Sequence, residues 1–443
     1  MTAFETPEHH DVLVIGGGPA GSTAAAILAE KGREVLVLER EKFPRYSVGE
    51  SLMPYCYFTL ERLGVVDRLK TSRFPKKYSV QFVSLAGEVS QPFYFFQHLK
   101  HEASTTWQVL RSEFDQMLLD NARRKGASVL EETTATGLVY QDGAVAGVRT
   151  VDKSGATREF SSPMTIDATG RAAFSANKNH WRIRDEHLNR TAIWTYYEGA
   201  LRDPGLDEGA TTIAYLPEKG WFWYIPLADN VVSVGLVAQK QYLFKREREP
   251  AAIFEREIGN NPWIKQHLAE GHRSGPYRVT GDYSYRSRYS AADGLILAGD
   301  SFAFLDPVFS SGIFLALKSG EWAADAVDEA LRANDFSAAR FEQYGTQLCR
   351  GIEAMRKLVY AFYDKEFSFR QLMKAHPDLR GDLTDCLIGN LFRDFGQLFQ
   401  AAAELVPLPD PLDHGQSLRN QGGIQGRADS ASRAETAATR SPV

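Results

Sequence analysis

Cysteine is scarce in this chain of 443 residues, which contains only Cys56, Cys349 and Cys386. Three scattered cysteines are too few for a disulfide framework or a cysteine-rich zinc site, so no metal is expected. A protein without disulfides is typical of a reducing compartment, and we therefore expect a cytoplasmic location.

The chain also lacks an excess of basic charge, because 51 lysines and arginines face 56 aspartates and glutamates, for a net charge of −5. This balance does not indicate the excess of positive charge that is typical of nucleic-acid-binding proteins. No uniformly apolar run reaches the roughly 18 residues that a spanning helix needs, so no membrane partner is expected. The N-terminus has no basic segment followed by an apolar one, which argues against a secretory signal.

The composition that is present is globular, with 43% hydrophobic and 24% charged residues, and it suffices for a large core. It changes once, near the C-terminal end. From about Asp410 the sequence is rich in Gly, Ser, Ala and Gln and has no aromatic residue. We therefore expect residues 406–443 to form a disordered tail.

The body of the chain begins with a strand, a glycine turn, a helix and a second strand. Residues 11–15 (DVLVI) and 34–38 (EVLVL) are apolar β-runs, and residues 22–31 between them are rich in alanine. This order predicts a βαβ unit with a parallel sheet.

A GxGxxG motif lies in that turn. Gly16 allows the tight turn, Gly18 lets the backbone approach a pyrophosphate at the helix N-terminus, and Gly21 permits close helix packing. Glu39 ends the second strand and can accept hydrogen bonds from ribose hydroxyls. The strand–turn–helix context predicts a dinucleotide site, although the motif alone does not separate NAD from FAD.

Three further segments favour FAD. Residues 167–171 (DATGR) resemble the ATG turn of FAD-binding oxidoreductases, and residues 297–306 (LAGDSFAFLD) resemble their second flavin motif. In that motif Asp300 would hold the ribityl or pyrophosphate end of the flavin. Arg111 matches an arginine that commonly lies against FAD. Together these segments are similar to the para-hydroxybenzoate-hydroxylase type of flavoprotein.

The resemblance implies an α/β fold, in which a Rossmann-like FAD-binding domain carries an inserted mixed β-sheet substrate domain and a helical C-terminal region. The expected boundaries are 8–75, 105–180 and 275–325 for the FAD-binding domain, 76–104 and 181–274 for the substrate domain, and 326–405 for the helical region. No second GxGxxG is present. Reduced FAD would therefore come from a separate flavin reductase.

Four motifs resemble those of the flavin-dependent halogenases. Residues 221–226 (WFWYIP) follow the pattern WxWxIP, residues 304–312 (FLDPVFSSG) follow FxxPxxSxG, and residues 49–51 read GES. Residues 74–82 (FPKKYSVQF) resemble the segment that carries the family's active-site lysine. Spacing from the two flanking phenylalanines makes Lys77 the better match and Lys76 the alternative.

In that family, reduced FAD and oxygen give a flavin hydroperoxide, and halide attacks it to yield hypohalous acid. The resemblance implies that chloride or bromide binds backbone N–H groups at Ser310, Ser311 and Gly312, where a helix begins. Hypohalous acid would then travel to Lys77. An ammonium there could hydrogen-bond the acid, and a neutral amine could carry the halogen as a chloramine; the sequence does not choose between them.

The resemblance assigns roles to further residues. Trp221 and Trp223 share one face of a predicted strand and, with Ile225 and Pro226, would form the tunnel wall between flavin and substrate. Glu50 would act with Lys77 in catalysis. The residues expected to bind FAD are Gly16, Gly18, Ala20, Gly21, Glu39, Arg40, Arg111, Gly299, Asp300, Pro307, Gly312 and Ile313.

The expected substrate is an electron-rich aromatic molecule. Tryptophan-type halogenases place a glutamate where Phe309 stands here, and a phenol or pyrrole needs that carboxylate less than an indole does. The resemblance is strongest to phenol and carrier-tethered pyrrole halogenases, which leaves a free or a carrier-bound substrate open. The alternatives are a monooxygenase or a geranylgeranyl-reductase-like dehydrogenase of the same fold, and a non-enzymatic flavoprotein. WxWxIP and the matched lysine favour the halogenase.

Overall fold

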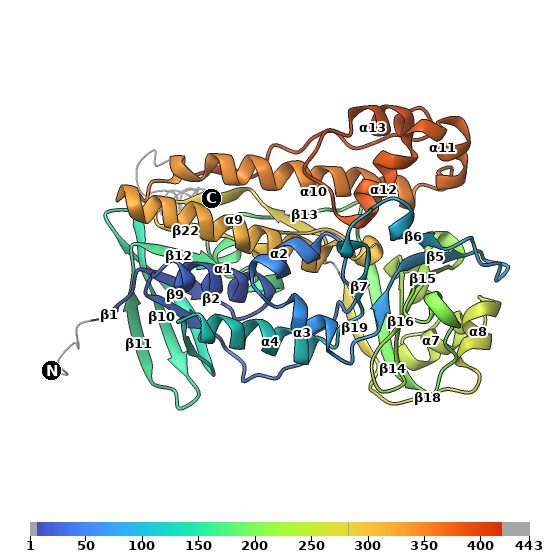
Figure 1. Ribbon diagram of the computed structural model, residues 1–443, viewed down its shortest axis with the longest axis horizontal. Coiled ribbons are helices and arrows are strands. Elements are labelled where there is room, and N and C mark those ends of the chain that lie inside the picture. The colour runs from blue at the N-terminus through green and yellow to red at the C-terminus, as the bar shows by residue number, and fades with distance from the viewer. Residues whose placement is uncertain (1–6, 282, 419–443) are drawn as a thin grey trace, which may run out of the picture.

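A seven-stranded sheet forms the centre of the FAD-binding half in the computed structural model, which describes residues 7–281 and 283–418 (Figure 1). Its strands, in spatial order, are β24 (Gln416–Ser417), β21 (Tyr289–Ala292), β22 (Leu295–Leu297), β12 (Met164–Asp167), β2 (Val12–Ile15), β3 (Val35–Leu38) and β8 (Ser128–Leu130). The five strands from β22 to β8 are parallel. The predicted βαβ unit is thus confirmed.

Helices and a second sheet bury both faces of this sheet. On one face Val12 and Val14 join the alanines of α1 (Pro19–Glu30) in the main core, together with α4 (Arg111–Arg124) and α9 (Ser311–Ala333). On the other face Leu13 and Ile15 pack with Val148 of the smaller sheet. That sheet contains β1 (Glu8–His9), β11 (Thr157–Ser161), β10 (Ala144–Asp152) and β9 (Thr133–Gln141). Burial on both faces explains why β2 and β3 are uniformly apolar.

A second large sheet stands beside the first, on the right in Figure 1. Its strands, in spatial order, are β18 (His272–Arg273), β14 (Thr191–Glu198), β17 (Val231–Ala238), β16 (Trp221–Pro226), β15 (Thr211–Tyr215), β5 (Ser79–Val83) and β6 (Phe93–Tyr94), and β19 (Arg278–Gly281) also pairs with β14. Phe222 and Tyr224 face α7 (Pro250–Ile258) and α8 (Pro262–Leu268). Trp221 and Trp223 face the main core instead. The expected fold class is therefore confirmed.

Two small sheets connect the halves. β4 (Lys76–Lys77) pairs with β7 (Thr106–Trp107), so that Lys77 lies opposite Thr106. The second contains β13 (Arg182–Arg184), β20 (Tyr285–Ser287) and β23 (Ala303–Phe304). Short helices complete this part of the chain: α2 (Cys56–Arg62), α3 (Val66–Lys70), α5 (Phe174–Lys178) and α6 (Lys240–Leu243).

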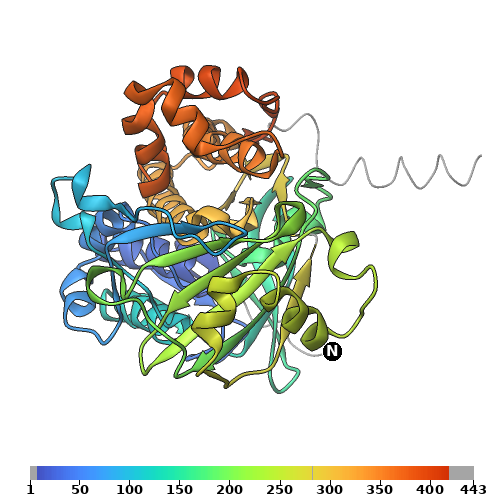
Figure 2. The ribbon, with the colours of Figure 1, turned by 90° about the vertical axis from the view of Figure 1, so that its right-hand side faces the viewer.

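The C-terminal helices lie along the top of both halves in Figures 1 and 2. They are α10 (Glu342–Tyr363), α11 (Phe369–Ala375), α12 (Arg380–Ile388) and α13 (Gly396–Ala403). None of the helices in the described ranges is long and apolar enough to cross a membrane.

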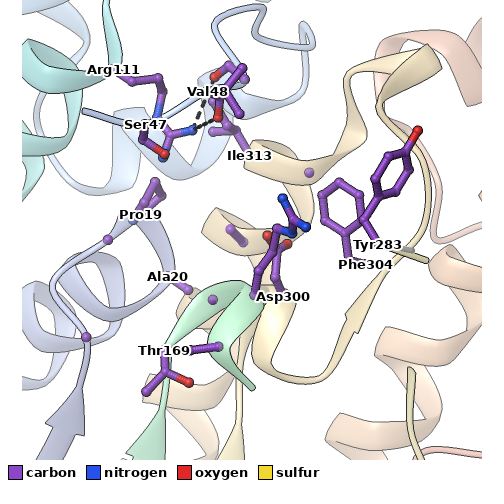
Figure 3. A pocket seen from close by; sticks show the side chains of 18 of the residues that line it. Pro19, Ala20, Ser47, Val48, Arg111, Thr169, Tyr283, Asp300, Phe304 and Ile313 are labelled. Atoms are coloured by element: carbon purple, nitrogen blue, oxygen red, sulfur yellow. Dashed lines mark hydrogen bonds between the residues drawn. The ribbon is translucent and has the colours of Figure 1, made fainter. Parts of the chain in front are cut away.

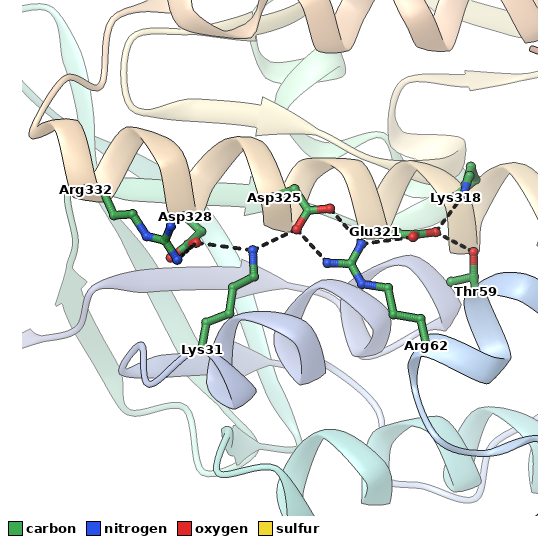
Figure 4. A network of polar contacts seen from close by, with 8 residues as sticks. All are labelled: Lys31, Thr59, Arg62, Lys318, Glu321, Asp325, Asp328 and Arg332. Carbon is green, nitrogen blue, oxygen red and sulfur yellow. Dashed lines mark hydrogen bonds and ion pairs between the residues drawn. The ribbon is translucent and has the colours of Figure 1, made fainter.

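A network of polar contacts fixes α9 against α1 and α2 (Figure 4). Asp325 of α9 accepts hydrogen bonds from Lys31 at 2.8 Å and from Arg62 at 2.7 Å. The buried Glu321 accepts from Thr59 at 2.6 Å. Exposed ion pairs each contribute little to the free energy of unfolding. Glu321 is different, because it is buried and accepts hydrogen bonds from several donors. The network sets the position of α9, whose first residues reach the candidate site described below.

The expected domain boundaries differ from the observed ones in three places. β19 lies beyond residue 274 and still pairs with the large sheet through β14. β13 lies within 181–274 but pairs with β20 of the small sheet. α9 runs across the expected boundary at 325 because its amphipathic pattern continues without a break. These differences affect only the boundaries of the units, and the order of the units along the chain is unchanged.

The expectation of a disordered tail from residue 406 is wrong for residues 406–418. β24 pairs in parallel with β21, and the buried His414 lies 3.1 Å from Glu353 through its Nε2 atom. Arg356 donates to the Asp410 carbonyl. Polar and backbone contacts order this segment, and an apolar pattern could not reveal them. The rest of the expected tail, 419–443, lies outside the described residues.

Removing residues 411–443 should therefore destabilise the protein, because it deletes an edge strand and takes away the His414 partner of Glu353. We expect a melting temperature several degrees lower than that of a chain truncated after Leu418, measured by differential scanning calorimetry. Equal melting temperatures for the two truncations would contradict the structural role of 411–418.

Candidate active site

A cavity of about 640 Å³ lies between the two halves (Figure 3). A volume of this size suits a large cofactor. Of the residues expected to bind FAD, ten line it: Gly16, Gly18, Ala20, Glu39, Arg40, Arg111, Asp300, Pro307, Gly312 and Ile313. Segments far apart in the sequence thus converge on one chamber, as the motifs predict.

The other two expected residues shape the cavity without lining it. A Cβ on Gly21 would lie 1.9 Å from the Gly16 carbonyl oxygen, so only glycine lets α1 pack this closely on the turn. Gly299 has a φ of +63°, and its N–H donates to Ser319 at 2.8 Å. Both glycines therefore serve the backbone geometry of the flavin motifs.

Glu39 is held by the glycine turn itself. One carboxylate oxygen accepts from the Gly17 N–H at 2.7 Å, and the other accepts from the Glu41 N–H at 2.8 Å. The side chain is buried and lines the cavity. This fixes a carboxylate at the end of the second strand, where the fold places ribose hydroxyls.

The opposite end of the cavity carries Arg111 and Asp300. Arg111 is buried and paired through two nitrogens with Asp115, and it also donates to the Val48 carbonyl at 2.7 Å (Figure 3). Among the described residues, none donates a hydrogen bond to the Asp300 carboxylate, and burial raises the pKa of this carboxyl to about 6. A half-buried acceptor that lines the cavity and has no donor fits a ligand rich in hydroxyls. The residues present therefore fit FAD.

The expected halide-binding residues lie at the start of α9. Ser310 has a left-handed φ of +56°, and α9 begins at the next residue. Ser310 and Gly312 line the cavity, whereas Ser311 is buried and does not line it. The first N–H groups of a helix have no partner within it, and the beginning of this 23-residue helix borders the chamber at Gly312 and Ile313, an arrangement that suits an anion.

Asp306, which the sequence patterns did not single out, lies at the same loop. It accepts a hydrogen bond from the Val308 N–H at 3.0 Å and another from the Tyr363 hydroxyl at 3.0 Å. Trp221 donates in turn to the Tyr363 oxygen at 2.9 Å. Burial raises the pKa of Asp306 to about 7. This chain of contacts joins the tryptophan wall, the end of α10 and the halide loop.

The tryptophan wall occupies β16 as expected. Trp221, Trp223 and Ile225 line the cavity, whereas Pro226 is buried and does not line it. Gly235 lies opposite Trp223 on β17, and a Cβ there would come within 2.2 Å of the indole. The alternation of β16 thus turns the indoles toward the cavity and Phe222 and Tyr224 toward the other core.

Glu50 lines the cavity and is almost fully buried. The Tyr196 hydroxyl donates to its carboxylate at 2.8 Å. Burial raises the pKa of Glu50, despite the opposing effects of Tyr196 and Arg111. Tyr196 comes from β14, about 150 residues away, and no motif marks it. Burial thus disfavours the charged form of this carboxyl beside the chamber.

The two candidate lysines have opposite environments. Lys76 is exposed, whereas Lys77 is only 2% exposed. Successive residues of a strand face opposite sides, which explains the difference. Lys77 Nζ donates to Ser51 Oγ at 2.8 Å and to the Leu52 carbonyl at 3.2 Å. Because burial disfavours the charged form, the pKa of Lys77 falls to about 7.

Lys77 does not itself line the cavity, although Ser51 does. Phe309 lies in a cluster of aromatic rings. Phe309 contacts Phe362 at 5.7 Å and Phe369 at 6.2 Å between ring centroids, and Phe369 also contacts Phe82. Phe309, at the position of the family's glutamate, therefore contributes an apolar surface next to the C-terminal helices.

Replacing Gly18 by valine should weaken FAD binding without unfolding the protein. A Cβ at Gly18 would meet only the flexible end of Arg45, at 3.3 Å, so the fold tolerates a side chain that obstructs the pyrophosphate. We expect FAD affinity to fall at least about tenfold, or about 1.4 kcal/mol. Fluorescence titration measures the affinity, and thermal melting without FAD checks the fold. Unchanged affinity would contradict the dinucleotide geometry.

Replacing Lys77 by methionine should stabilise the protein without FAD. The folded Lys77 has a pKa of about 7 against an ordinary 10.5, so the cost of burying the charge is full below pH 7. The cost then shrinks as pH rises, because the folded state releases its proton before the unfolded state does. Urea unfolding should show a larger gain at about pH 7 than at about pH 9.5. The exposed Lys76→Met variant is the control, and a gain independent of pH would contradict the burial of charge.

Comparison with known proteins agrees with this geometry. The model of the family described as tryptophan halogenase matches residues 11–104 and 95–405. A 1H-pyrrole-2-carbonyl-[peptidyl-carrier protein] chlorinase of Pseudomonas fluorescens is 30% identical over 412 residues, covering 86% of this chain and 90% of the relative. A tryptophan 2-halogenase of Chondromyces crocatus is 33% identical over 369 residues, covering 82% and 69%.

A solved structure is also similar. The flavin-dependent brominase Bmp2 superimposes with a TM-score of 0.82 at 29% identity, covering 89% of this chain and 98% of that one. The predicted resemblance, the FAD cofactor and the enzymatic nature of the protein are therefore confirmed. The chain belongs to the tryptophan halogenase family and is a flavin-dependent halogenase, an oxidoreductase that uses FAD and halide.

Proposed function

We propose that this enzyme halogenates an electron-rich phenol or pyrrole at Lys77, with reduced FAD supplied by a separate flavin reductase. The observation that carries the proposal is the placement of Lys77, a buried amine one hydroxyl group away from the flavin cavity. The free cysteines Cys56, Cys349 and Cys386 support a cytoplasmic location.

The bound cofactor supplies the redox chemistry that converts oxygen and halide to hypohalous acid. The protein contributes the surroundings. The start of α9 offers N–H groups to the halide, and the indoles of Trp221 and Trp223 exclude the organic substrate from the chamber. Glu50 places a carboxyl group beside the chamber, and burial raises its pKa. Lys77 receives the oxidant on the far side of Ser51.

The contacts of Lys77 support a neutral amine as well as an ammonium. Its two acceptors, Ser51 Oγ and the Leu52 carbonyl, match the two N–H groups of an amine and leave its lone pair free. An ammonium has a third N–H, which could bond hypohalous acid. A pKa of about 7 lets both forms exist near neutral pH. The exposed Lys76 offers neither arrangement.

Phe309 supports a phenol or pyrrole rather than free tryptophan. Its ring packs among Phe362 and Phe369, so no carboxylate from this position can assist an indole. The carrier-bound pyrrole of the Pseudomonas fluorescens relative supports a tethered substrate, whereas the tryptophan 2-halogenase relative keeps indoles among the substrates to be tested.

The test supplies purified enzyme with FAD, a flavin reductase, NADH, oxygen and either chloride or bromide. Phenols, free pyrroles, pyrrole-loaded carrier protein and tryptophan are offered, and products are read by mass spectrometry. We expect a halogen isotope pattern on a phenol or pyrrole. A mass gain of one oxygen would overturn the proposal in favour of a monooxygenase, and halogenation of tryptophan alone would overturn the substrate assignment.

The role of Lys77 has its own test. Lys77→Ala should lower product formation at least about a hundredfold, which corresponds to about 2.7 kcal/mol, while FAD binding and NADH-dependent oxygen consumption continue. Lys76→Ala is the matched control, because it removes the adjacent exposed lysine, and it should retain activity. Product formation by Lys77→Ala at the wild-type rate would contradict the assigned role.

A further inference from the structure

Two hydroxyl side chains separate the flavin cavity from Lys77. Ser51 follows Glu50 in the segment that borders the cavity, and Thr211 begins β15 of the large sheet. Both are buried and both line the cavity. Their oxygens lie 2.7 Å apart, and Ser51 Oγ accepts from Lys77 Nζ at 2.8 Å. The path from cavity to lysine is thus a short hydrogen-bonded bridge of Thr211, Ser51 and Lys77.

The amide of Gln108 fixes the other side of this bridge. Its Nε2 atom donates to the Gly209 carbonyl at 2.9 Å and to Thr211 Oγ1 at 2.9 Å. The Gly209 carbonyl accepts only from a donor, so this contact determines which end of the amide is nitrogen. Thr211 Oγ1 is therefore an acceptor toward Gln108, just as Ser51 Oγ is an acceptor toward Lys77.

The two hydroxyl groups have more protons than the hydrogen bond between them uses. Each hydroxyl has one proton and two lone pairs, and one hydrogen bond joins Ser51 and Thr211 with either as donor. That bond uses one of the two protons. While Lys77 is an ammonium, the other proton has no acceptor among the described residues, and both hydroxyls border the cavity. With Lys77 in that form, the pair presents one unused O–H donor at the cavity end of the bridge, whichever of the two hydroxyls donates to the other.

We propose that Ser51 and Thr211 form a binding site for hypohalous acid. The unused O–H donates a hydrogen bond to the oxygen of the acid and positions its halogen toward Lys77. Ser51 and Thr211 are positioning residues, and they act by fixing Lys77 and the acid in one line. The inference rests on the proposed function, since it assumes that Lys77 receives the oxidant.

The surroundings suit this role. Ile213, two residues after Thr211 on β15, and Trp221 also line the cavity; the Ile213 side chain has no polar atom, and the Trp221 N–H already donates to the Tyr363 oxygen. Lys77 has its two acceptors in Ser51 and Leu52, which orient Nζ toward the bridge. A small neutral acid therefore meets the unused hydroxyl donor next to Lys77.

The test compares where the oxidant goes. Each variant is run as FAD-loaded enzyme with flavin reductase and halide, and two quantities are measured: halogenated product, and hypohalous acid caught by a small 1,3-dione trap in solution. Ser51→Ala removes the link to Lys77. We expect its ratio of escaped to productive oxidant to rise at least about tenfold, with total oxidant and FAD affinity unchanged. Ser51→Thr, which keeps the hydroxyl, should restore the ratio.

Thr211→Val should raise the ratio less than Ser51→Ala does, because Ser51 retains both its own proton and its contact with Lys77. Thr212→Val is the matched control on the same strand: Thr212 bonds Gln81 and does not line the cavity, so its ratio should equal that of the wild type. If Ser51→Ala fails to fold or to bind FAD, Ser51→Cys replaces it, since a thiol is a weaker donor of similar size.

The outcomes separate this inference from the function on which it rests. Loss of product in Lys77→Ala together with a wild-type ratio in Ser51→Ala would overturn the proposed binding site for hypohalous acid and leave the proposed function intact. Full product formation by Lys77→Ala, or no oxidant from the wild type, would overturn the proposed function itself. Increased escape in both Ser51→Ala and Thr212→Val would also overturn the inference, because the effect would then be general loosening of the sheet.

Discussion

The hydrogen bond between Lys77 Nζ and Ser51 Oγ, 2.8 Å long, ties the lysine to the wall of the flavin cavity. Lys77 belongs to a two-residue strand that pairs with β7, and Ser51 belongs to the segment beside α1 and the flavin motifs. In the proposed function an oxidant made in the flavin cavity must reach Lys77. The contact with Ser51 places the buried amine directly behind the cavity wall.

Burial also changes the protonation of the ionisable groups around the flavin cavity. Glu50, Asp306 and Lys77 are buried and Asp300 is half-buried, and burial shifts the pKa of each group in the direction that favours its neutral form. A pKa of about 7 lets Asp306 and Lys77 exchange protons near neutral pH. Backbone N–H groups at the start of α9 would stabilise a halide there.

The sequence predicts the flavin half of the site well, because its motifs are contiguous. Each of the residues Gly16, Gly18 and Glu39 lies within one βαβ unit, where local spacing dictates geometry. The bridge could not be predicted in this way. Ser51 and Thr211 are 160 residues apart, and Gln108 links them, because it pairs with Ser51 in an isolated bridge and donates a hydrogen bond to Thr211.

Other differences have similar causes. Strand alternation places Lys77 inward and Lys76 outward, but a KK pair does not tell which face is buried until β7 is paired with it. No sequence pattern marks Tyr196, because a tertiary contact alone brings it to the site. Asp306 lies within two of the motifs, but its contact with Tyr363 of α10 does not follow from them. The order of segment 411–418 escapes prediction because it comes from backbone pairing and from His414, which hydropathy does not reveal.

The most direct measurement is the titration of the Lys77 amine itself, by NMR of protein labelled with 13C at the lysine ε-carbon. The resonance is assigned by its absence in Lys77→Met. The account predicts a midpoint of about 7, because the amine is buried with hydroxyl and carbonyl acceptors and without a carboxylate. A midpoint near the ordinary value of 10.5 would show that Lys77 is solvated or paired with an acid, and would contradict the buried relay to the flavin cavity.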